Sequence, residues 1–155
     1  MSKNNKDQEL FNRIKDIFNE KIPFNKVLGL KVESIEYNQV SITFNMRDQL
    51  IGNYLRGTLH GGVISSVIDV TGGLSAFMGI QQKSRVDNLE SKIDMFKKLG
   101  TIDLRIDYLR PGLGSKFIAT GYTLRTGNKI AVTRIEIKNE SNELIAVGTG
   151  SYVVA

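Results

Sequence analysis

The sequence predicts a single α+β domain, in which an antiparallel sheet of about six strands wraps one long buried helix and a further helix stands at the N-terminus. Three observations predict this architecture. A chain of 155 residues has the size of one domain. Six short segments carry the residue pattern of strands. Between the second and the third of these lies one stretch that is apolar on every side, which is typical of a helix enclosed by its surroundings.

The N-terminal segment predicts an amphipathic helix that packs on the domain. Its apolar residues recur at helical spacing up to a proline, namely Leu10, Phe11, Ile14, Ile17, Phe18, Ile22 and then Pro23. Residues 1–24 are therefore interpreted as a helical extension. An irregular segment over residues 24–30 is expected to lead into two strands, residues 32–37 and 40–46.

The central segment, residues 57–80, predicts the buried helix. Its apolar residues fall on every side, while its glycines and β-branched residues give it poor intrinsic helix propensity. Tertiary packing must therefore stabilise it, and the glycines allow another backbone to come close. The polar residues 81–100 follow as an insert, which we expect to form a short second helix or a flap.

The last third of the chain predicts strands alone. Four segments, residues 102–108, 117–125, 130–138 and 144–153, are separated by short turns. Consecutive strands with short turns predict an antiparallel meander. The whole of residues 1–155 is accordingly expected to form one domain.

The composition excludes several kinds of chemistry. With no cysteine and one histidine, the chain has no disulfide, thiol nucleophile, zinc finger or iron–sulfur cluster, and we expect no metal and no cofactor. The 21 basic and 16 acidic residues are mixed along the chain, so we expect no nucleic-acid partner. The N-terminus is polar and the apolar stretch 63–80 contains polar residues. We therefore expect no signal peptide, no membrane association and a cytoplasmic location.

Asp69 is the most informative residue, because it lies in the middle of the apolar helix. An unpaired carboxylate there would cost several kcal/mol of desolvation, so something must compensate it. One interpretation is a structural aspartate that accepts a hydrogen bond from a backbone amide or pairs with an arginine. The other is a general base or nucleophile, since a poorly solvated carboxylate is reactive.

His60, Gly61 and Gly62 open the same helix. Amides at a helix N-terminus that no side chain shields form an anion site, which suits a developing oxyanion; the two glycines also suit a simple loop-to-helix joint. Nine residues separate His60 from Asp69, which in a helix is about 13 Å of rise and about half a turn. The two cannot easily share one site within a chain, so joint action predicts a homodimer with two sites.

Residues 57–69, together with residues 101–112, resemble the hotdog-fold acyl-CoA thioesterases of the phenylacetate-pathway (PaaI-like) branch. The resemblance covers roughly residues 25–155. It implies a hotdog fold, with a six-stranded sheet around a long helix, and two subunits that form composite active sites. It leaves open whether these dimers pair into tetramers. Coenzyme A is then part of the substrate.

The resemblance also implies roles for single residues. Asp69 matches the catalytic carboxylate, the Gly61 amide matches the oxyanion donor, and His60 matches the residue that supports this loop and contacts substrate from the other subunit. Thr101 stands where relatives place a hydroxyl near the nucleophilic water. Many relatives carry an asparagine six residues before the histidine, where this chain has Tyr54 and its neighbour Asn53.

Further residues are expected to contact the substrate. Gly62 and Tyr54 belong to the loop that precedes and opens the helix. Arg110, Arg125 and Lys129 lie at strand ends or turns, where each is either a solvated surface charge or a partner for the phosphates of coenzyme A.

Three functions are compatible with these residues. The first is hydrolysis of a fatty or aromatic acyl-CoA to the free acid and coenzyme A. The second is a hotdog-fold hydratase or dehydratase, although the chain lacks a glutamate at the helix position and a proline-rich loop after the histidine. The third is an acyl-CoA-binding protein without turnover. Acyl preference and the choice between an anhydride and a general-base mechanism stay open.

Overall fold

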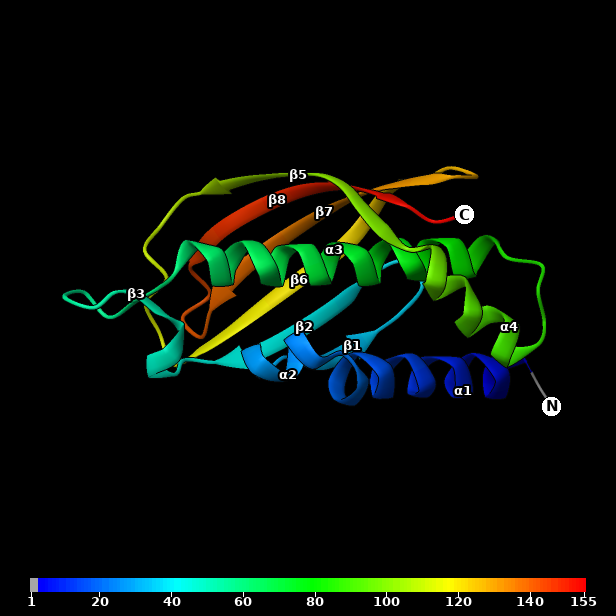
Figure 1. Ribbon diagram of the computed structural model, residues 1–155, viewed down its shortest axis with the longest axis horizontal. Coiled ribbons are helices and arrows are strands. Elements are labelled where there is room, and N and C mark those ends of the chain that lie inside the picture. The colour runs from blue at the N-terminus through cyan, green and yellow to red at the C-terminus, as the bar shows by residue number, and fades with distance from the viewer. Residues whose placement is uncertain (1–2) are drawn as a thin grey trace.

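The computed structural model describes residues 3–155 and confirms the predicted fold class. A six-stranded antiparallel sheet, in the order β1-β2-β6-β7-β8-β5, curves around the long helix α3, Gly61–Lys83 (Figure 1). The strands are β1 (Lys31–Ile35), β2 (Val40–Asn45), β5 (Gly100–Tyr108), β6 (Lys116–Thr126), β7 (Ile130–Asn139) and β8 (Leu144–Val153).

The position of β5 differs from the expected meander. Strands β6, β7 and β8 follow one another as predicted, but β5 pairs with β8 and forms the edge of the sheet. The reason is the connection over residues 109–115, which contains Pro111 and crosses the end of the sheet to reach β6 beside β2. The outer edge of β5 is thus left without a strand partner among the described residues.

Helix α3 fills the curved face of the sheet, and most of its residues from Val63 to Gln81 are buried. Glycines permit this close packing. A Cβ atom on Gly72 would overlap the hydroxyl of Tyr152, and one on Gly148 would overlap the side chain of Ile68. By length and composition α3 is apolar enough to cross a membrane, contrary to the sequence-based expectation. Its apolar stretch is 72% buried against the rest of the protein, however, as expected of a core helix.

The N-terminal segment packs beside α3 as three short helical pieces: α1 (Lys3–Asp16), the π-helical turn η1 (Ile17–Lys21) and α2 (Pro23–Leu28). The expectation of an irregular segment over residues 24–30 is wrong, because Pro23 at the first helical position starts α2. Gly29, with φ of 70°, ends it.

The insert after α3 is shorter than the sequence predicts. Helix α3 continues to Lys83, and the polar segment then forms α4 (Leu89–Asp94) and the 3₁₀ turn η3 (Met95–Lys98). Phe96 in η3 packs edge-on against Phe18 and Phe77, with ring centroids 5.7 and 5.6 Å away.

A second 3₁₀ turn and a small hairpin precede α3, namely η2 (Asp48–Leu50), β3 (Ile51–Asn53) and β4 (Thr58–Leu59).

Candidate active site

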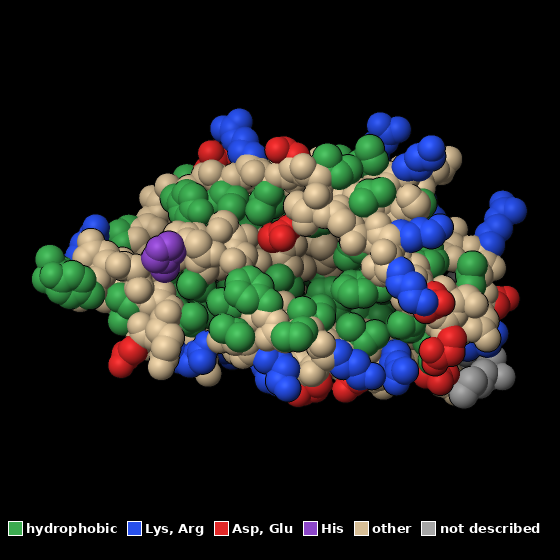
Figure 2. Space-filling view, viewed as in Figure 1, with side chains coloured by type: hydrophobic (Ala, Val, Ile, Leu, Met, Phe, Trp, Pro, Cys, Tyr) green, Lys and Arg blue, Asp and Glu red, His purple; other side chains and the backbone are tan. Residues whose placement is uncertain are grey.

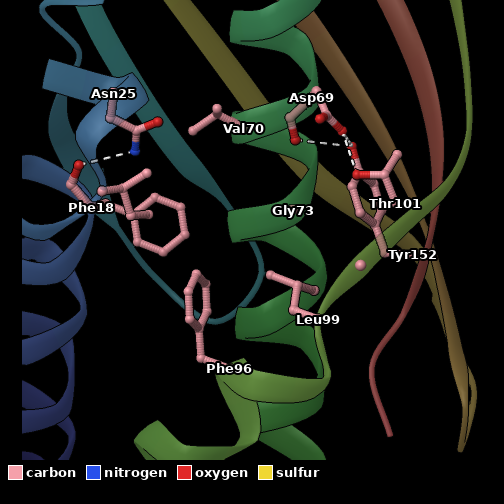
Figure 3. Close-up of a pocket in the computed structure, with 11 residues that line it drawn as sticks. Phe18, Asn25, Asp69, Val70, Gly73, Phe96, Leu99, Thr101 and Tyr152 are labelled. Atoms are coloured by element: carbon pink, nitrogen blue, oxygen red, sulfur yellow. Dashed lines mark hydrogen bonds between the residues drawn. The ribbon is translucent and has the colours of Figure 1, made fainter. Parts of the chain in front are cut away.

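The carboxylate of Asp69 lies midway along α3 and is hydrogen-bonded by two hydroxyl groups (Figure 3). The Thr101 hydroxyl donates to Oδ1 at 2.8 Å. The Tyr152 hydroxyl donates to the Asp69 backbone carbonyl at 3.0 Å and lies 3.3 Å from Oδ1. Hydrogen bonds between described side chains and the carboxylate therefore converge on Oδ1, so that Oδ2 keeps its lone pairs. Asp69 is half-buried rather than enclosed, and two hydroxyls compensate it instead of an arginine or an amide.

Strand register brings these two donors together. Thr101 near the start of β5 is paired with Tyr152 near the end of β8, and residues directly opposite in adjacent strands point to the same face. Burial raises the pKa of the Tyr152 phenol well above its usual value, and the negative charge of Asp69 raises it further. The phenol therefore stays protonated and acts as a hydrogen-bond donor.

An apolar cavity of about 160 Å³ opens beside Asp69. Its wall combines the N-terminal helices, α3 and the insert, because Phe18, Ile22, Val70, Phe96 and Leu99 all line it. Figure 2 shows apolar side chains gathered on this face of the protein, with the histidine toward one end of it. The expected insert thus contributes side chains that cover the cavity, and a hydrophobic group of a ligand fits beside the carboxylate.

His60 forms the N-cap of α3. Its Nδ1 atom accepts a hydrogen bond from the Gly62 amide at 2.7 Å, while its side chain is exposed. Gly61 is the first residue of the helix, so its amide has no carbonyl within the helix to which it can donate. The hydroxyl of Tyr108 donates to the Gly61 carbonyl at 3.0 Å and so fixes this turn. The structure therefore leaves one oriented helix-end amide, that of Gly61, for a ligand oxygen.

The loop residues expected to act with His60 lie near it. A cleft of about 500 Å³ is lined by Asn53, Tyr54, His60 and Gly61, among others. Asn53 ends β3, and its backbone carbonyl accepts hydrogen bonds from the amides of the following turn. Tyr54 is 84% exposed at the tip of the hairpin.

Within one chain the two groups line different cavities. Asp69 and Thr101 line the apolar cavity, whereas His60 and Gly61 line the cleft at the start of α3. This is the separation that their spacing along a helix predicts.

The three basic residues expected at the phosphates are exposed but are not together. Arg125 lies one residue before the end of β6 and Lys129 lies in the following turn, at the end of the sheet where β5 starts. Arg110 follows the other end of β5 and donates a hydrogen bond to the Leu144 carbonyl at 2.9 Å. Among residues 3–155 there is no group of three or more His, Asp or Glu side chains that could hold a metal ion.

The sequence did not predict the roles of two tyrosines. Tyr108 and Tyr152 both occupy strand positions in which they look like ordinary packing residues, and only the register places their hydroxyls against α3. The segment 101–112 contains Tyr108, but the residue type alone gave it no role.

Comparison with known proteins identifies the family. Residues 56–146 match the model of the thioesterase superfamily. A Salmonella typhimurium protein named medium/long-chain acyl-CoA thioesterase YigI is 40% identical over 139 residues, which are 90% of this chain and 90% of that protein. The Escherichia coli K12 protein of the same name is 39% identical over 139 residues with the same coverage.

Solved structures agree. A Shewanella oneidensis protein related to the thioesterase superfamily has a TM-score of 0.91 and 41% identity, and the match covers 96% of this chain and 97% of that one. A Syntrophus aciditrophicus protein has a TM-score of 0.88 and 54% identity, covering 99% and 100% of the two chains. The matches do not single out the PaaI-like branch, which stays a prediction. Because the family model covers more than half of the chain and the Salmonella relative is 40% identical over 90% of it, the chain belongs to the thioesterase superfamily, as the resemblance of its two motifs predicted.

Proposed function

We propose that the protein hydrolyses acyl-CoA thioesters to the free acid and coenzyme A. The observation that carries the proposal is a carboxylate, Asp69, oriented by two hydroxyls beside an apolar cavity. Relatives about 40% identical are named medium/long-chain acyl-CoA thioesterases. A thioester with an apolar acyl group needs these two elements, a basic oxygen and an apolar pocket beside it.

In the proposed reaction Asp69 acts on the thioester carbonyl. Thr101 and Tyr152 hold Oδ1, so Oδ2 is the atom that accepts a proton from the attacking water or bonds to the carbonyl carbon. The carbonyl oxygen becomes an oxyanion and takes a hydrogen bond from the Gly61 amide. Collapse of the tetrahedral intermediate breaks the carbon–sulfur bond and expels coenzyme A as its thiolate. In the general-base route the acid is then already formed, and the proton held by Asp69 passes to the thiolate. In the nucleophilic route the acyl group is left as an anhydride on Asp69, and water hydrolyses it to release the acid and restore the carboxylate.

The oxyanion donor belongs to a second subunit in this proposal. Thr101, next to Asp69, lies near the start of β5, and Tyr108, next to Gly61, lies at its end. If two copies pair their free β5 edges antiparallel about a two-fold axis, the start of one strand meets the end of the other. Asp69 then lies beside the partner's Gly61. Exposed apolar side chains on β5 support this pairing, because Ile102 is 56% exposed.

The same arrangement accounts for the separated basic residues. Antiparallel pairing brings Arg110 of one subunit to the end of the sheet at which the other subunit has Arg125 and Lys129. We propose that these cations attract the phosphates of coenzyme A. Each composite site thus draws its charges from both subunits.

The substitution Asp69→Asn tests the function, because an amide has the same shape but is no base. We expect turnover in a thiol-release assay to fall about 10²- to 10⁴-fold, with an unchanged dimer in size-exclusion chromatography. Near-normal turnover would remove Asp69 from the mechanism. Hydration of crotonyl-CoA would favour a hydratase, and tight acyl-CoA binding without thiol release would favour a binding protein.

A further inference from the structure

Asn25 holds an unsatisfied acceptor in the wall of the apolar cavity. It lies on α2, its side chain is 1% exposed, and it lines the same cavity as Asp69. Its Nδ2 group donates to the Phe18 carbonyl at 3.0 Å. Its Oδ1 atom is buried and has no hydrogen-bond partner among the described residues. A buried acceptor without a donor is costly, so its presence calls for a donor that the chain itself does not supply.

The orientation of the amide is fixed. Turning it over would place Oδ1 against the Phe18 carbonyl oxygen, where two acceptors repel each other and the hydrogen bond is lost. Figure 3 shows the Asn25 oxygen pointing away from Phe18 and toward Val70 on α3, across the cavity. The acceptor therefore faces the space that a ligand would fill.

The other polar groups of the cavity do not satisfy Asn25. The hydroxyls of Thr101 and Tyr152 are engaged with Asp69. The wall is otherwise formed by apolar side chains and glycine backbone, including Ile22 and Leu99. A buried water needs two to four polar partners, and the surroundings of Asn25 offer it few. The missing donor is better supplied by the ligand.

A hydroxyl group is the donor that fits this wall. It is neutral, whereas an ammonium group would bring an uncompensated charge into an apolar cavity. A buried hydroxyl that donates to Asn25 needs no second hydrogen-bond partner. An amide would bring a carbonyl oxygen with it, which would become a new unsatisfied acceptor. The cavity of about 160 Å³ is close to the size of cavities that bind benzene, so the hydroxyl must lie within about the first six carbons of an acyl chain.

We propose that Asn25 is a specificity-determining residue, which accepts a hydrogen bond from a hydroxyl on the acyl chain and favours hydroxylated over unsubstituted aliphatic acyl thioesters. This inference rests on the proposed function, since the ligand in the cavity is taken to be the acyl group of a thioester substrate. It assigns the N-terminal extension a part in substrate choice, because α2 supplies the acceptor.

The kinetic test compares octanoyl-CoA with its monohydroxy derivatives, in which the hydroxyl is moved along the chain. For at least one isomer, the ratio of its kcat/KM to that of octanoyl-CoA is expected to fall about three- to tenfold in Asn25→Leu relative to the wild type, the usual effect of one neutral hydrogen bond. Gln81→Leu is the matched control. Gln81 is also a buried amide with an unpartnered oxygen, but it lies outside this cavity, so its ratio should stay unchanged.

A binding test separates this inference from the proposed function, because it needs no turnover. Cyclohexanol and cyclohexane are titrated into the dimer and followed by NMR. In the wild type, cyclohexanol should shift the side-chain amide signal of Asn25, and cyclohexane should not. The preference for cyclohexanol should fall three- to tenfold in Asn25→Leu. The role of Asn25 would be overturned if the wild type and Asn25→Leu had the same preference for cyclohexanol over cyclohexane, or if the wild-type amide signal did not shift. Either result would hold even if the enzyme hydrolyses thioesters. If no thioester is hydrolysed, the proposed function fails while this measurement still decides on Asn25.

Discussion

The substitution Thr101→Val removes one of the two hydroxyls that orient the Asp69 carboxylate and keeps the shape of the side chain. The lost hydrogen bond is 2.8 Å long and ends on a carboxylate oxygen. Hydrogen bonds to charged groups contribute about 1.5–3 kcal/mol. Thr101 is exposed in the single chain, and Tyr152 still lies 3.3 Å from Oδ1. We therefore take the lower half of this range, about 1.5–2 kcal/mol, which is about a 10- to 30-fold loss of kcat.

The assay is steady-state thiol release from an acyl-CoA, with kcat and KM measured separately. KM should change little, because Thr101 is expected to act on the carboxylate and not on the acyl chain. The melting temperature should fall by about 3–8 °C, because a loss of about 1.5–2 kcal/mol shifts it by about 2–4 °C per kcal/mol in a chain of this size. Thr120→Val is the control, a strand threonine on β6 paired with Ser41 of β2, away from Asp69. An unchanged kcat in Thr101→Val, or an equal loss in Thr120→Val, would refute the reasoning.

Three further substitutions probe the cavity, the second donor and acid stability. Tyr152→Phe should lower kcat about tenfold and also lower the free energy of unfolding by about 1 kcal/mol, because its hydroxyl is buried and bonded to the Asp69 backbone; chemical denaturation and thiol release measure the two effects. Phe96→Ala should shift the preferred acyl chain to greater length, because Phe96 walls the cavity, and a thiol-release screen over chain lengths would show no shift if another residue limits the chain. Glu140→Gln concerns pH: the Ser115 amide, which donates to this carboxylate, lowers the pKa of Glu140 from 4.5 to about 2. The folded state is thereby stabilised above pH 4.5, and this contribution is lost as the pH falls toward 2. The difference in melting temperature between wild type and Glu140→Gln should therefore shrink from pH 6 to pH 2, and a constant difference would contradict the assignment.

The number and place of the strands could be predicted because each carries its own local pattern. The partner of β5 could not, because pairing depends on the path of the connection over residues 109–115 across the sheet. Helix α2 was missed for a different reason. Pro23 reads equally well as the end of one helix and as the first residue of the next, and only the left-handed Gly29 after Leu28 shows which segment became helical.

The candidate site likewise has features that the sequence predicts and features that only the structure shows. The separation of His60 from Asp69 follows from helix geometry and needed no structure. The partners of Asp69 depend on the register of β5 against β8, which pairs Thr101 with Tyr152. Asn25 carries no sequence signal at all, because an asparagine in a short polar segment is ordinary, and only its burial and its unpartnered oxygen single it out.

Strand β5 links these observations, because it contacts helix α3 near both ends through a hydroxyl group. Thr101 donates to Asp69 near the start of the strand, and Tyr108 donates to Gly61 at its end. A shift of the strand along the helix would break both hydrogen bonds together. The irregular register between Thr101 and Asp103 lets the strand start under Asp69 while the rest stays paired with β8. Because the same strand has the free edge of the sheet, the surface proposed to join two subunits also positions the base and the oxyanion donor. Subunit pairing and catalytic geometry are therefore expected to depend on one element, so that a substitution on the outer edge of β5 should lower activity and dimer stability in parallel.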